Sequence, residues 1–209
     1  MGGLNLTPVV RDLLIINVIV FIGTMIFPGE DLKNTLVTLL AAFYPESPLF
    51  RPWQLLTHMF MHGSIGHIFF NMYGLAILGP PIEYMFGARK FLFYYLFCGF
   101  GAVALQFGVQ YYELHVLGHE SVLITPMLGA SGAIFGLLAA YGMLFPENQL
   151  MIMFIPYPIR AKYFVLLYAG VELFLGLEGY QRGVAHFAHV GGALFGALLI
   201  LYWRRTRQD

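Results

Sequence analysis

The chain has 209 residues, of which 59% are hydrophobic and only 11% are charged. A typical soluble domain carries about 25% charged residues, so the composition excludes an ordinary soluble domain and indicates an integral membrane protein. Eleven Lys and Arg residues balance eleven Asp and Glu residues, and this neutral balance argues for neither nucleic acid nor an acidic partner.

Apolar runs near the length that crosses a bilayer, about 20 residues, recur along the chain and predict an all-α membrane protein with six transmembrane helices. The predicted spans are residues 12–28, 64–86, 89–112, 129–146, 159–177 and 184–203. The first run has no basic leader and no small-residue cleavage site after it, so we interpret it as a retained span rather than a signal peptide. No repeat of domain size is visible, and we expect a single domain over residues 1–209.

Residues 29–63, between the first two spans, are too rich in proline and charge to cross the membrane. Apolar residues recur there at helical spacing after Asn34, which we expect to cap a helix, until prolines break the pattern. The sequence therefore predicts a long, partly helical first loop whose short helix lies in the membrane interface.

The basic residues predict the orientation of the chain. With six spans the two termini share one side of the membrane, and eight of the eleven basic residues fall there: Arg11, Arg89, Lys90, Arg160, Lys162, Arg204, Arg205 and Arg207. The termini are therefore expected to be cytoplasmic. All seven histidines then belong to the outer half of the protein.

The fourth span opens with Gly129-Ala130-Ser131-Gly132, a serine among small residues. Such a stretch has two interpretations: small residues that let two membrane helices pack closely, or a nucleophile near the start of a helix. The sixth span carries a similar stretch that begins at His189, and the second span carries His67 and Asn71. These polar positions favour the second interpretation.

The polar residues of spans two, four and six lie at similar depth. All three spans enter the membrane from the outer side, and counting about 1.5 Å per residue places Ser131, His67 and His189 within about 10 Å of the outer surface. Polar groups in hydrocarbon are costly unless they meet one another or water, so we expect these three to converge. Gly192 and Gly196 share the helix face of His189, which lets that helix approach the fourth span closely.

A serine hydroxyl beside a neutral histidine is the minimal activated nucleophile, because the imidazole takes the proton during attack and returns it to the leaving amine. Acyl transfer also needs hydrogen-bond donors for the developing oxyanion. His67 and Asn71 share one helix face, and the Ser131 backbone N–H, near a helix start, lacks an intrahelical acceptor. All three are candidate oxyanion donors. The alternative for His67 and Asn71 is a hydrogen-bond pair that holds two helices together.

Four motifs occur in order along most of the chain. They are His62-x4-His67-x3-Asn71, Glu83-x3-Gly87-x2-Lys90, Gly129-x-Ser131-Gly132 and His189-x2-Gly192-x3-Gly196. In this order they resemble the rhomboid family of intramembrane serine proteases, and in particular its bacterial type with a six-helix core.

The resemblance implies a rhomboid-like bundle in the bacterial inner membrane, with an active site that opens to the outer side. Such a protein hydrolyses peptide bonds in or near the transmembrane helices of substrate membrane proteins, and it uses no cofactor and no metal.

On the matching positions, the resemblance implies Ser131 as the nucleophile and His189 as the general base of a catalytic dyad. It implies His67, Asn71 and the Ser131 backbone amide as oxyanion donors, with Gly129 as a further candidate. The implied supporting residues are His62, Phe135, Gly192 and Gly196.

Two positions depart from the family pattern. Trp53 is followed by Gln54 where the family commonly has arginine, which removes a cation that would anchor the first loop. Phe135 stands four residues after the serine where the family often has tyrosine, so its ring can pack on His189 but offers no hydroxyl. Neither departure removes a catalytic group.

Glu172 lies inside the fifth span, where a carboxylate is a functional candidate by default. Its place in the sequence lets it lie near the outer end of that span. We expect it to face water or a loop rather than to act as a third catalytic member.

Three other functions have some support in the sequence. A metalloprotease is suggested by His58-x3-His62 and by His186-x2-His189, but the glutamate of a His-Glu-x-x-His motif is missing. A transporter needs paired intramembrane charges or discontinuous helices, and Glu172 is the only candidate charge. A rhomboid-like protein that binds membrane helices without cleaving them is marked by loss of the serine or the histidine, and both are present.

Overall fold

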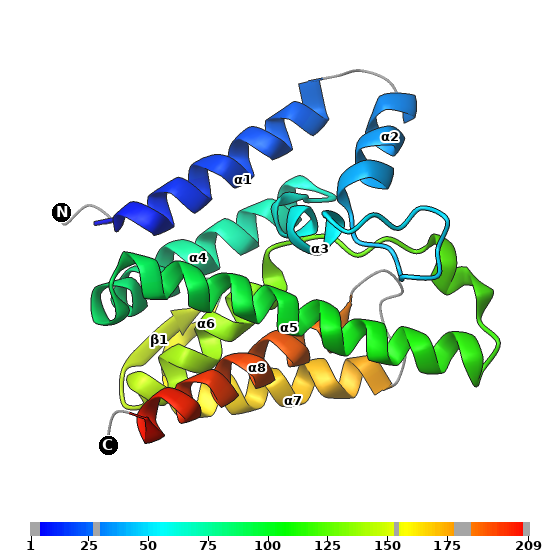
Figure 1. Ribbon diagram of the computed structural model, residues 1–209. Helices are drawn as coiled ribbons and strands as arrows, with labels where there is room; N and C mark the ends of the chain where they lie inside the picture. Colours follow the sequence, from blue (N-terminus) through cyan, green and yellow to red (C-terminus); the bar gives the residue numbers. More distant parts are fainter. Residues whose placement is uncertain (1–4, 27–29, 153–154, 178–184, 207–209) are drawn as a thin grey trace.

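The computed structural model describes residues 5–26, 30–152, 155–177 and 185–206, and within them the chain is mostly helical (Figure 1). The α-helices are α1 (Pro8–Ile26), α2 (Glu30–Leu40), α3 (Gln54–Thr57), α4 (Ile65–Phe86), α5 (Ala88–His115), α6 (Ser131–Leu144), α7 (Ala161–Leu177) and α8 (His186–Arg205). The other described elements are two 3-10 helices, η1 (His58–Phe60) and η2 (Glu120–Ile124), and the antiparallel strands β1 (Gln149–Ile152) and β2 (Ile155–Arg160).

Six of these helices fall on the predicted spans. By length and composition, α1, α4, α5 and α8 are able to cross a membrane, whereas α6 and α7 are shorter, with 14 and 17 residues. The other two α-helices in the described part of the chain, α2 and α3, lie in the first loop, where the sequence predicts one. Residues 27–28 of the first predicted span and residue 184 of the sixth lie outside the described residues.

Two local predictions are wrong. Asn34 does not cap a helix, because α2 already begins at Glu30 and the Asn34 carbonyl accepts a hydrogen bond from Thr38 Oγ1 within that helix. Residues 159–160 belong to β2 rather than to the fifth span, because they pair with Leu150 and Gln149 of β1. A short apolar run does not by itself distinguish a strand from the first turn of a helix.

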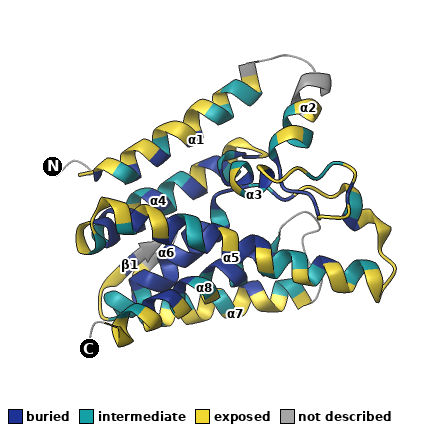
Figure 2. Cartoon of the chain, viewed as in Figure 1, coloured by how far each residue is buried: buried dark blue, intermediate teal, exposed yellow. Residues whose placement is uncertain are grey.

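Helix α6 forms the centre of the bundle. It contacts α4, α5, α7 and α8, and every residue from Gly132 to Tyr141 is buried (Figure 2). An apolar helix covered on all sides is typical of a bundle core. At about 1.5 Å per residue α6 is about 21 Å long, shorter than the roughly 30 Å hydrocarbon core of a bilayer. A bilayer around the bundle therefore extends beyond at least one end of α6.

The outer faces of the bundle carry large apolar side chains. Ile19 of α1 is 63% exposed and Leu166 of α7 is 73% exposed. In a soluble bundle these faces would be polar, so their composition supports an integral membrane protein whose outer helices contact lipid.

Gln54 anchors the first loop. Its side chain is fully buried, and its amide nitrogen donates hydrogen bonds to the carbonyls of Thr38 (2.8 Å) and Leu49 (3.0 Å). Its amide oxygen accepts a hydrogen bond from the backbone N–H of Arg51 (2.9 Å). Three hydrogen bonds thus hold the loop at the position where the family commonly has a cation.

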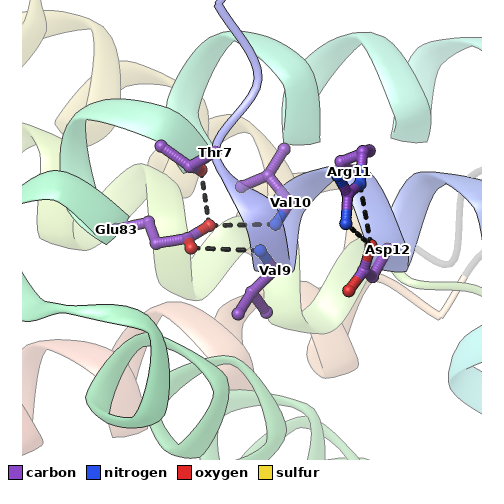
Figure 3. A network of polar contacts seen from close by, with 6 residues as sticks. All are labelled: Thr7, Val9, Val10, Arg11, Asp12 and Glu83. Carbon is purple, nitrogen blue, oxygen red and sulfur yellow. Dashed lines mark hydrogen bonds and ion pairs between the residues drawn. The ribbon is translucent and has the colours of Figure 1, made fainter.

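Glu83 of α4 caps the start of α1 (Figure 3). Its buried carboxylate accepts hydrogen bonds from the backbone N–H groups of Val9 (3.0 Å) and Val10 (2.9 Å) and from Thr7 Oγ1. The first N–H groups of a helix lack intrahelical partners and attract negative charge. A side chain from another helix therefore holds α1 to the bundle.

We expect Glu83→Ala to lower the free energy of unfolding by about 3 kcal/mol, because buried donors then lose a charged acceptor. Glu83→Gln keeps one carbonyl acceptor and should cost about half as much. Thermal unfolding in detergent measures both effects, with the exposed Glu120→Ala as control. Wild-type stability in Glu83→Ala would contradict the capping role.

Candidate active site

Ser131 begins α6, and the first loop fixes the segment before it. The Gly129 N–H donates a hydrogen bond to the His58 carbonyl (2.9 Å), and Met127 pairs with Ala42 through two backbone hydrogen bonds of 2.8 Å. Gly129 has a φ of +126°, a conformation that L side chains rarely adopt. The path into Ser131 therefore depends on this glycine and on the packing of the first loop.

Ser131 and His189 are in hydrogen-bond contact, although they come from different helices. The distance between Ser131 Oγ and His189 Nε2 is 2.8 Å, and both side chains are partly buried. Helices α6 and α8 approach this closely because Gly132 and Gly192 have no side chain between them. A Cβ at Gly192 would lie 1.8 Å from the Gly132 carbonyl oxygen.

An aromatic ring packs flat against the His189 imidazole and fixes its orientation. Phe135, one turn after Ser131, stacks on His189 with ring centroids 4.4 Å apart and an interplanar angle of 4°. Tyr168 of α7 packs on Phe135 in turn, at 4.9 Å. The stacking needs no hydroxyl, so phenylalanine at position 135 supplies the ring contact.

The environment of Glu172 differs from the sequence expectation. This side chain is 6% exposed, and its Oε2 lies 2.8 Å from His189 Nδ1 and 2.7 Å from His186 Nδ1. We expected it to face water or a loop, but α7 packs on α8 and turns the carboxylate toward two ring nitrogens. The signal in the sequence was the carboxylate within an apolar run. The position of Glu172 along α7 did not show which neighbouring helix its side chain contacts.

His67 and Asn71 line the same cavity as Ser131 and His189, which has a volume of about 610 Å³. A Cβ added at Gly129 would lie 2.7 Å from His67 Nε2 and 3.6 Å from Ser131 Oγ. Asn71 is buried, and its Nδ2 has no hydrogen-bond partner within the described residues. The cavity thus combines a hydroxyl, an imidazole and an available amide donor.

His62 contacts the ring of His67 edge-on, with centroids 5.0 Å apart. It lies before the first turn of α4 and is buried, and neither ring nitrogen has a hydrogen-bond partner within the described residues. Burial lowers the pKa of His62 to about 4, so the ring is neutral near pH 7. The contact between His62 and His67 is therefore ring packing without a charge on His62.

Glu172, His186 and His189 are the one group of three possible metal ligands in the described part of the chain, with ligand atoms within 4.8 Å of one another. Nitrogen and carboxylate donors of this kind bind zinc in enzymes. Here, however, two hydrogen bonds already join the same atoms. His58 does not join them, since its Nδ1 contacts the Gln54 carbonyl at 2.9 Å. Hydrogen bonding accounts for the cluster without a metal.

The arrangement suits nucleophilic acyl transfer. A hydroxyl that donates to an imidazole is the activated nucleophile of that chemistry, and hydrogen-bond donors in the adjoining cavity are what a developing oxyanion requires. The exposed apolar faces of the outer helices place this chemistry within a membrane protein.

Comparison with known proteins gives a consistent result. Residues 50–206 match the family model described as Rhomboid domain. The chain is 32% identical over 208 residues to Rhomboid protease AarA of Providencia stuartii, and the match covers 95% of this chain and 72% of that protein. It is 36% identical over 147 residues to RHOMBOID-like protein 4 of Arabidopsis thaliana, covering 70% of this chain and 33% of that one. It is 26% identical over 182 residues to Rhomboid-like protease 3 of Toxoplasma gondii, covering 86% and 62%. The chain spans less than two thirds of these last two relatives.

Proposed function

The chain belongs to the rhomboid family and is an intramembrane serine protease of that family, and from this premise we propose that Ser131 and His189 form its catalytic dyad. The dyad hydrolyses peptide bonds in or near the transmembrane helices of substrate proteins. The observation that carries the proposal is the 2.8 Å contact between Ser131 Oγ and His189 Nε2, because that hydrogen bond is the path by which the hydroxyl proton leaves during attack.

The reaction proceeds in two acyl-transfer steps. Ser131 Oγ attacks the carbonyl carbon of the scissile bond while His189 Nε2 takes the hydroxyl proton, and the C–N bond then breaks as this proton passes to the leaving amine. Water attacks the resulting ester and gives a proton to Nε2, which returns it to Ser131 Oγ as the carboxylic acid leaves. The adjoining cavity of about 610 Å³ offers space for the peptide and the water.

We propose that His67, Asn71 and the Ser131 backbone N–H stabilise the oxyanion. Two observations support this role: His67 Nε2 and Ser131 Oγ both lie beside Gly129, and the Asn71 amide lines the cavity. Gly129 contributes by leaving room for the carbonyl oxygen between them.

We expect His67→Ala and Asn71→Ala each to lower kcat about 10²- to 10³-fold, the usual effect of removing one oxyanion donor. Steady-state cleavage of a single-span substrate measures kcat, and thermal unfolding checks that each variant is folded. The exposed His119→Ala serves as control. An unchanged kcat would remove the corresponding residue from the oxyanion site.

We also propose that α1, α4, α5, α6, α7 and α8 all cross the membrane. Neighbouring helices surround the short α6, and irregular backbone at membrane depth is tolerated where protein covers it. The distribution of basic residues supports cytoplasmic termini, and the motif resemblance supports the bacterial inner membrane. The dyad then opens to the outer side.

Substrate entry is proposed to occur beside α7. Within this helix only Ala161 and Glu172 are buried, and Phe164 and Tyr168 line the cavity. An element with few buried contacts opens at low free energy. Substrate helices that contain Gly, Ala or Ser are the easiest to accept, since glycine weakens a helix and small side chains give up little packing.

Labelling with a serine-directed fluorophosphonate tests the proposed function. The probe reacts with an activated serine, so it should label the wild type and the exposed-serine control Ser121→Ala, but not Ser131→Ala. A metal chelator should leave labelling and cleavage unchanged. Equal labelling of Ser131→Ala would reject the nucleophile, and loss of activity in chelator would instead favour a metal at Glu172, His186 and His189.

A further inference from the structure

Glu172 is a buried carboxylate that the proposed dyad does not use. It lies on α7, and its Oε2 lies 2.8 Å from His189 Nδ1 and 2.7 Å from His186 Nδ1. A carboxylate in a membrane bundle is costly unless donors satisfy it. These two contacts satisfy one of its oxygens with two ring nitrogens of α8.

The contacts determine where the His189 proton lies. An ionised carboxylate only accepts hydrogen bonds, so His189 Nδ1 must carry a proton and donate it to Glu172. In a neutral imidazole the other nitrogen is then an acceptor. Nε2 therefore accepts the hydrogen bond from the Ser131 hydroxyl across 2.8 Å. The opposite tautomer would set the Nδ1 lone pair against the carboxylate.

We propose that Glu172 is a positioning residue for this protease: its carboxylate holds His189 in the Nδ1–H tautomer and aims Nε2 at Ser131. The same negative charge stabilises the imidazolium that forms when Nε2 takes the hydroxyl proton. His186 donates to the same carboxylate oxygen and thereby keeps Glu172 in place. The inference rests on the proposed function, because it concerns the base of the proposed dyad.

A purely structural role gives a different ranking of variants. If Glu172 only joins α7 to α8, the isosteric Glu172→Gln should retain most activity and Glu172→Ala should lose the most. In a positioning role, the Gln amide N–H₂ can donate to Nδ1 and hold the ring in the wrong tautomer, whereas Ala leaves the ring free to choose. Positioning therefore predicts that Glu172→Gln is no more active than Glu172→Ala.

Steady-state cleavage of a single-span substrate in liposomes separates the two roles. We expect Glu172→Gln to lower kcat at least about 10²-fold, with KM changed less than about threefold. The equivalent change in a soluble serine protease triad costs about 10⁴-fold. Glu172→Asp should recover part of the loss, and the exposed Glu120→Gln should match the wild type.

The pH profile provides a readout that a structural role does not move. Loss of a neighbouring negative charge disfavours the imidazolium, so the pH profile of kcat/KM in Glu172→Ala should differ from that of the wild type. Among the described residues, the other ionisable groups facing this pair are His186 on α8, His67 on α4 and Tyr168 on α7, and all three remain in the variant.

Nitrogen-15 NMR of the histidine rings in the wild-type enzyme tests the inference even if the Glu172 variants fail to fold. We expect a protonated Nδ1 and an unprotonated Nε2 for His189 near pH 7, assigned by the signal that His189→Asn loses. The reverse tautomer, or wild-type kcat and pH profile in folded Glu172→Gln, overturns the inference. In that case fluorophosphonate labelling of Ser131 still supports the dyad, whereas cleavage by Ser131→Ala would overturn the proposed function itself.

Discussion

Ser131→Ala and His189→Ala should each reduce cleavage of a single-span substrate to the background rate, a loss of at least about 10⁴-fold in kcat/KM. The hydroxyl is the attacking group and the imidazole is the base in hydrogen-bond contact with it, so neither works without the other. When two groups act as one unit, the losses of activity from substituting each of them are strongly non-additive. The double variant should therefore be no less active than either single variant.

Reconstitution in liposomes with a fluorescent substrate measures these rates. Ser121→Ala and His119→Ala, both at exposed residues of the connection between α5 and α6, control for the loss of a serine and of a histidine. Thermal unfolding midpoints near the wild-type value show that the folded bundle is retained. Cleavage above one hundredth of the wild-type rate in either single variant would argue against the dyad.

Gly192→Ala should have the largest effect on stability. The added Cβ would lie 1.8 Å from the Gly132 carbonyl oxygen and 2.6 Å from its carbonyl carbon. Both are backbone atoms, so no side-chain rotation relieves the clash, and α6 and α8 must separate. Overpacking of a core costs about 1 to 3 kcal/mol and occasionally more. We expect at least the upper end of this range, together with loss of activity because separation moves His189 away from Ser131.

Gly170→Ala is the matched control, since the space around a Cβ at this helical glycine of α7 is open within 4 Å. Alanine has the higher helix propensity, so this variant should unfold at or slightly above the wild-type temperature. Circular dichroism in detergent follows both variants. A Gly192→Ala protein that melts within about 2 °C of the wild type would contradict the close contact of α6 and α8 at this glycine.

The spacing of polar and small residues predicted much of the candidate site. Ser131, His67 and His189 were expected at one depth because three helices enter from the same side, and Gly192 was expected to permit close approach. Periodicity also predicted helices close to α1, α4, α5, α6, α7 and α8, of which four are long and apolar enough to cross a membrane. These features are local, because they depend on residues within one or two turns of the same helix.

Contacts between helices were harder to predict. Asn34 was expected to cap a helix that in fact begins earlier. Gln54 removes the cation that anchors the first loop in the family pattern, and the sequence did not show that its amide makes three hydrogen bonds instead. In both cases the sequence showed the residue type but not the partner.

By itself, the sequence determined that this is a helical membrane protein with the motifs of a serine protease, because hydrophobic periodicity and motif spacing are properties of single segments. Only the tertiary structure decided that Glu172 meets His189. The rotation of α7 about its own axis determines which neighbour a buried carboxylate faces. This rotation depends on packing against α8, where His189 lies 17 residues after Glu172.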